Sequence, residues 1–174
     1  MSMAYDFYIG IKKMLIRFVI FMAVFFNPLI TCSAQSISQA EKLASFIEKN
    51  DLELGRVHIN LHQMSRAISA AEEVNVSSAA DCINSISSQA SLLNAYVSIS
   101  ILMIDPRDRA TVKKFIPINS KATTKIADYC TDRLNVIMPS IKNQAILLEL
   151  QKARDLIGNL RDEINANIPA KTRP

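Results

Sequence analysis

The sequence is poor in the residues on which β-sheets and tight turns depend. The chain of 174 residues contains no tryptophan and only three glycines, and aromatic residues make up 6% of it. Strands are enriched in aromatic residues, and the tightest hairpin turns need glycine. This scarcity argues against a β-sheet protein. Alanine, leucine and lysine are plentiful instead, and these residues favour helices.

The chain also lacks the patterns that identify common enzymes and nucleic-acid binders. After residue 34 it has 17 basic and 15 acidic residues, so its charge gives no sign of nucleic-acid binding. No serine has the flanking glycines of a hydrolase nucleophile elbow, and the residue after His58 is Ile59 rather than the glutamate of a zinc-protease motif. We therefore expect a protein that is not an enzyme and needs no cofactor.

No apolar run in the chain is long enough to cross a membrane. The longest, Phe18–Phe26, would reach about 14 Å as a helix, roughly half of a ~30 Å hydrocarbon core. Basic residues precede it at 12–17, and small residues follow at 31–34. This order is typical of a secretory signal peptide, here cleaved after Ala34.

The leader divides the chain into three expected parts. They are a signal peptide at 1–34, a helical domain at 35–166 and a disordered tail at 167–174 with two prolines. The mature protein should then lie outside the cytoplasm, in the periplasm of a bacterium or otherwise secreted, with no transmembrane segment. Two alternatives stay open: a lipid on Cys32, as in bacterial lipoproteins, and an uncleaved anchor.

Apolar residues in the mature part recur at alternating spacings of three and four. The first stripe, Ala40–Ala71, is apolar at nine of its ten positions, and Asn50 is the exception. This spacing predicts one long helix over 38–74, opened by a capping box of Ser38 and Glu41. A break near Asn50 is the alternative.

Three further stripes predict the remaining helices. They cover 78–104, with inward positions running from Ala79 to Ile104, then 106–138, and finally 143–166. The inward positions of the last helix are Ile146, Leu150, Ala153, Ile157, Leu160 and Ile164. A proline inside a helix costs about 3 kcal/mol, so Pro117 indicates either two helices or one kinked helix in the third segment, and we favour two. The predicted fold is all-α, an up-down-up-down four-helix bundle whose third helix is broken at Pro117.

The mature part retains two cysteines, Cys82 and Cys130. If the second and third helices form an antiparallel pair that turns near Pro106, the two cysteines lie level, because each is 24 residues from the turn. An even pair in an oxidising compartment predicts a disulfide, which would contribute roughly 3 to 4 kcal/mol. The alternative is two buried free thiols.

The only histidines, His58 and His62, lie one helical turn apart, which suits two ligands of one metal ion. If the first and second helices are joined by a turn near Val76, residues at equal height along the antiparallel helices can be matched as for the cysteines. This matching places Glu163 at the height of the histidines, where it could be a third ligand. A metal or small-ligand carrier is therefore one functional hypothesis. The alternative, which we favour, is two histidines at the boundary of an amphipathic helix.

Basic residues gather in the first half of the third helix, interrupted by an aromatic residue. The residues predicted to bind a partner are Arg107, Arg109, Lys113, Lys114 and Phe115. Such a segment suits a protein or an anionic surface, although a solvated helix face has the same composition. The first functional hypothesis is thus an exported helical bundle that binds another macromolecule through this segment or through a helix face.

Overall fold

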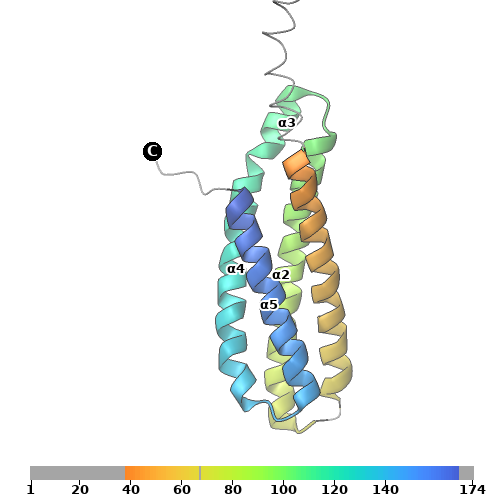
Figure 1. Cartoon of the computed structure of the whole chain (residues 1–174), viewed down its shortest axis with the longest axis vertical. Helices are drawn as coiled ribbons and strands as arrows, with labels where there is room; N and C mark the ends of the chain where they lie inside the picture. The colour runs from red at the N-terminus through yellow and green to blue at the C-terminus, as the bar shows by residue number, and fades with distance from the viewer. Residues whose placement is uncertain (1–37, 67, 169–174) are drawn as a thin grey trace, which may run out of the picture. The chain divides into compact units, whose positions relative to one another are not determined.

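The computed structural model describes residues 38–66 and 68–168, and these residues are helical with short links and no strand (Figure 1). The expected signal peptide at 1–34 and the tail from residue 169 lie outside the described residues. The helices are 38–65, α2 (Ala70–Leu102), α3 (Pro106–Lys113), α4 (Phe115–Ile137) and α5 (Gln144–Asn167), with a 3-10 turn at Met138–Ser140 after α4.

The helix over 38–65, α2, α4 and α5 lie side by side, and each runs antiparallel to the next (Figure 1). The all-α prediction, with four long helices, is confirmed for the described part of the chain. The four helices enclose one apolar core. Every inward position predicted for α5 is buried there: Ile146, Leu150, Ala153, Ile157, Leu160 and Ile164.

The first turn lies earlier than the sequence pattern predicted. The first helix ends at residue 65 rather than 74, and Val76, expected in the turn, is buried in α2. The Ser69 hydroxyl accepts a hydrogen bond from the backbone N–H of Glu72 at 3.4 Å and so caps α2. The Glu72 carboxylate in turn accepts from the backbone N–H groups of Lys142 and Asn143 at 2.8 and 3.2 Å. These contacts fix the turn at 66–69, although the apolar spacing continues through it.

The end of α2 also differs from the prediction. Ile104 was expected on the inward stripe, but it lies beyond the last residue of α2, Leu102, and is 93% exposed. The Asp105 carboxylate accepts from the backbone N–H of Arg107 at 2.7 Å and caps α3. Because a capping residue has extended backbone, the chain must leave the helical conformation before Asp105, and Ile104 leaves the stripe with it.

The third helix is divided in two, as we favoured, but at Lys114 rather than at Pro117. Pro117 is the third residue of α4, within the first turn. Backbone N–H groups in the first turn have no partner inside the helix, so the proline removes no hydrogen bond there.

Cys82 of α2 and Cys130 of α4 lie level, as predicted from their equal distance to the turn. Their sulfur atoms are 2.13 Å apart and their Cα atoms 5.6 Å apart, and both residues are buried. This is disulfide-bonding distance, and it joins the two helices near the middle of the core. A disulfide is consistent with an oxidising compartment.

Removing this bond should destabilise the fold. Because it closes a loop with a sequence separation of 48, we expect Cys82→Ala with Cys130→Ala to lower the free energy of unfolding by about 3 to 4 kcal/mol in urea. Reductant should lower the urea midpoint of the unaltered protein and leave that of the double variant unchanged. Alkylation of both thiols in the folded protein without reductant would contradict the bond.

Candidate functional site

The most exposed large apolar side chains of the described residues lie at one end of the helical unit. We define the α3 end as residues 102–118, which comprise the end of α2, the link to α3, α3 itself and the first turn of α4 (Figure 1). Its exposed large apolar side chains are Leu102 (78%), Ile104 (93%), Phe115 (44%) and Ile118 (64%). No residue of α3 is buried. The α3 end therefore contributes exposed surface rather than core.

The basic residues predicted to bind a partner divide into two kinds. Arg107, Lys113 and Lys114 are exposed, and within the described residues no ion pair includes them. Arg109 is half-buried, and its Nε and Nη2 atoms donate to the Met103 carbonyl oxygen, with Nε at 2.9 Å. It thus satisfies a carbonyl at the end of α2, so Arg109 holds the link in place while the other three remain free for a partner.

Phe115 anchors the start of α4 on α2. Its ring stacks on that of Tyr96, with centroids 5.6 Å apart and planes inclined by 22°. Since Phe115 is still 44% exposed, it belongs both to the packing between the helices and to the outer surface of the α3 end.

Positive charge is concentrated around the α3 end. Residues 102–118 contain four basic and two acidic residues, a net charge of +2. The rest of the chain after residue 34 contains the other 13 basic and 13 acidic residues, a net charge of zero. A cationic segment beside exposed apolar side chains can attract an anionic partner and bury apolar surface against it.

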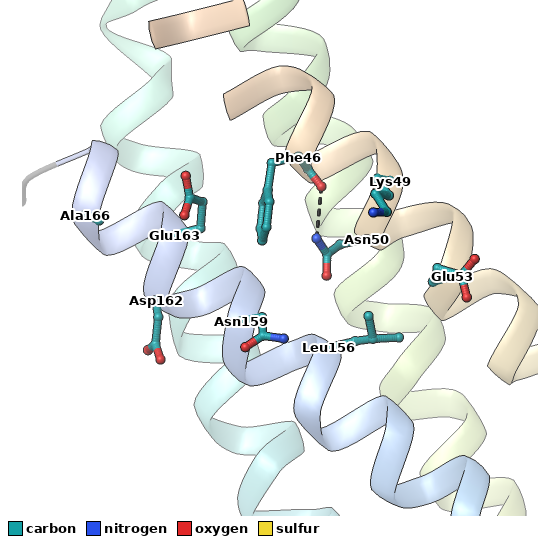
Figure 2. A pocket seen from close by; sticks show the side chains of 9 residues that line it. All are labelled: Phe46, Lys49, Asn50, Glu53, Leu156, Asn159, Asp162, Glu163 and Ala166. Carbon is teal, nitrogen blue, oxygen red and sulfur yellow. Dashed lines mark hydrogen bonds between the residues drawn. The ribbon is translucent and has the colours of Figure 1, made fainter. Parts of the chain in front are cut away.

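The two histidines contact each other, but Glu163 does not join them. The rings of His58 and His62 pack edge to face with centroids 4.6 Å apart; His58 is half-buried and His62 exposed. Glu163 instead lines a hollow with Phe46 and Asn50 (Figure 2). Among the described residues, no group of three histidine, cysteine or carboxylate side chains is placed to hold a metal. The predicted three-ligand set is thus not formed.

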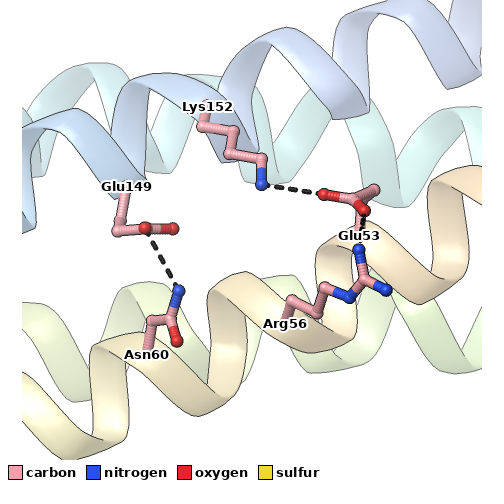
Figure 3. A network of polar contacts seen from close by, with 5 residues as sticks. All are labelled: Glu53, Arg56, Asn60, Glu149 and Lys152. Atoms are coloured by element: carbon pink, nitrogen blue, oxygen red, sulfur yellow. Dashed lines mark hydrogen bonds and ion pairs between the residues drawn. The ribbon is translucent and has the colours of Figure 1, made fainter.

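The position of the first turn explains this error. The amide of Asn60 donates to Glu149 at 3.2 Å, and the Lys152 ammonium donates to Glu53 at 2.8 Å, so the histidines lie level with residues near 150 of α5 (Figure 3). Glu163 is then roughly 18 to 20 Å further along the axis. The prediction matched residues of neighbouring helices by counting from a turn near Val76. Since the turn is at 66–69, this count assigned the wrong residues of α5 to the height of the histidines.

The polar contacts of Figure 3 hold the first helix against α5. Glu53 accepts from Lys152 and also pairs with Arg56 of its own helix. The hydrogen bond from Lys152 is the largest of the effects that lower the pKa of Glu53 below its usual value. These contacts are exposed or half-buried, so they fix the register of two helices more than they add stability.

The hollow of Figure 2 lies between the first helix and α5. The buried amide of Asn50 donates to the Phe46 carbonyl of its own helix at 3.0 Å, which explains how the one polar position of the stripe is tolerated. The lining mixes three carboxylates with one lysine, two asparagine side chains and apolar groups, so its chemistry favours no single class of ligand. The α3 end is therefore the stronger candidate.

Burial, reinforced by the neighbouring His62, lowers the pKa of His58 below 6.5, and Asp81 opposes this shift. Since the folded protein favours the neutral ring, stability should fall as the pH drops from about 6.5 through the pKa of folded His58. We expect an NMR titration to place that pKa below 6.5, to find it lower still in Asp81→Asn, and to find it higher in His62→Gln. A folded-state pKa at or above 6.5 would contradict this environment.

Comparisons with protein-family models, with curated proteins and with solved structures found no match for the chain. Function must therefore be argued from the residues themselves. Of the three places described, the histidine pair lacks a third ligand among the described residues and the hollow has a lining of mixed charge. The α3 end combines exposed apolar side chains with free positive charge.

Proposed function

We propose that this chain is an exported, non-enzymatic protein, an up-down-up-down four-helix bundle that binds another macromolecule through its α3 end. One observation carries the proposal: the most exposed apolar side chains, Ile104 and Leu102, occur in the same short stretch as the surplus of positive charge. Water solvates either feature alone at little cost, but together they match a partner that is both anionic and able to cover apolar surface.

Two observations support the exported state. The order of charge, apolar run and small residues at 12–34 is that of a signal peptide. Cys82 and Cys130 lie at disulfide-bonding distance, which suits an oxidising compartment such as the periplasm or the extracellular space. As a separate finding, none of the described helices combines the length and apolarity that a membrane span requires.

The alternative function, a metal or small-ligand carrier, would use His58 and His62. Only their mutual contact favours it. Two imidazoles offer half of the four ligands of a typical zinc site, and Glu163 lines a different part of the molecule. The interaction at the α3 end is therefore the function that the geometry supports better.

Site-specific photo-cross-linking in the cells that produce the protein tests the proposal. A photoreactive side chain in place of Ala110, exposed in α3, should form adducts with another macromolecule. The same group in place of Ala145, equally exposed at the start of α5 near the opposite end, is the matched control and should form few. Gel shift and mass spectrometry identify the adducts as protein or lipid.

Charge reversal then tests the role of the lysines. Lys113→Glu with Lys114→Glu should reduce the yield of the Ala110 adduct several-fold, because the surface loses its attraction for an anionic partner. Arg66→Glu with Lys142→Glu changes the net charge equally at the opposite end and should leave the yield unchanged. Equal adduct yields from the two positions, or equal effects of the two charge reversals, would contradict a binding surface at the α3 end.

A further inference from the structure

Ile104 and Leu102 are the most exposed of the large apolar side chains in the described residues, at 93% and 78%. They stand two residues apart where α2 gives way to α3, at the tip of the helical unit (Figure 1). Ile99, 43% exposed, continues the apolar surface one turn down α2. A small apolar surface at the end of a helical unit can insert among lipid acyl chains, and this requires no partner of complementary shape.

The charges around this tip are arranged as at a membrane interface. From Cys82 to Ile104 the chain has no charged residue, whereas the exposed cations Arg107, Lys113 and Lys114 follow within ten residues of Ile104 and outnumber the exposed carboxylates of Asp105 and Asp108. Peripheral membrane segments bury apolar side chains among the acyl chains while lysine and arginine bind the headgroups above them. The chain at the tip follows the same order, because an uncharged stretch ends at Ile104 and a cationic segment follows it.

We propose that the partner of the α3 end is the surface of an anionic lipid bilayer, with Leu102 and Ile104 inserted among the acyl chains and Arg107, Lys113 and Lys114 on the headgroups. This inference rests on the proposed function and names its partner. A protein partner is the competing outcome. Charge favours the bilayer, because residues 102–118 carry a net +2, and each basic residue near an anionic membrane strengthens partitioning about fivefold.

The experiment uses the exported protein, purified with its disulfide intact, and two kinds of vesicle. One contains phosphatidylcholine alone and the other an equal mixture of phosphatidylcholine and phosphatidylglycerol. Cosedimentation should show binding to the anionic vesicles that weakens as salt is raised, with far less binding to the neutral ones. Because the natural chain has no tryptophan, Ile104→Trp gives a reporter whose emission should shift to the blue on anionic vesicles, whereas Leu148→Trp on α5 should not shift.

Two pairs of variants separate the electrostatic and apolar parts of the surface. Lys113→Glu with Lys114→Glu should weaken binding to anionic vesicles about tenfold or more, against no change for Arg66→Glu with Lys142→Glu. Leu102→Ser with Ile104→Ser should weaken it by a similar factor, against no change for Val136→Ser with Leu148→Ser. All eight side chains are exposed, so circular dichroism should show unchanged helicity in every variant.

Absence of binding to anionic vesicles overturns the bilayer as the partner, and so does a tryptophan emission of the Ile104→Trp variant that the vesicles leave unchanged. Photo-cross-linking distinguishes the binding function of the α3 end from the identity of its partner. If the Ala110 position forms adducts with a protein while vesicles do not bind, the binding function stands and the lipid inference fails. If neither adducts nor vesicle binding occurs, both fail.

Discussion

The register between α2 and α4 is the constraint on which the other features depend. Cys82 and Cys130 lie at bonding distance in the core, and the Tyr96–Phe115 stack holds the same alignment nearer the tip. With two points of one helix pair fixed, the chain passes from α2 to α4 at one end of the unit, where the Asp105 cap starts α3 after the link at residues 103–105. Leu102 at the end of α2 and Ile104 in the link are exposed there, and no residue of α3 is buried.

Polar contacts, rather than apolar ones, set the remaining alignments. Asp51 of the first helix accepts hydrogen bonds from Ser87 and Ser91 of α2, and Glu53 binds Lys152 of α5. Apolar stripes with the same spacing can slide by one heptad and still bury leucine against isoleucine, whereas these pairs lose their partners if the helices slide. The first helix is thereby fixed at both of its neighbours, and His58 is kept away from Glu163.

The spacing of apolar residues predicts which positions are buried in the core. It does not predict the helix ends, because polar capping residues set them at places where the apolar spacing continues. All inward positions of α5 and the level of the cysteines followed from the pattern, because apolar burial dominates there. The first turn was misplaced because the stripe runs unbroken across it. Ser69 and Glu72 have the capping-box spacing that marks a helix start, and attention to this signal would have located the turn and removed Glu163 from the histidine site. The exposure of Ile104 follows from the Asp105 cap in the same way, so the apolar part of the α3 end was missed while its cations were recognised.

Hydrogen exchange of the disulfide-bonded protein, with and without anionic vesicles, tests the central claim most directly. The claim is that the α2–α4 register presents residues 102–118 as the surface that meets the partner. Vesicles should slow amide exchange in that segment and leave the opposite turn at 66–69 and the link at 141–143 unchanged. Slowed exchange at the opposite end, or slowing spread evenly over all helices, would contradict the account.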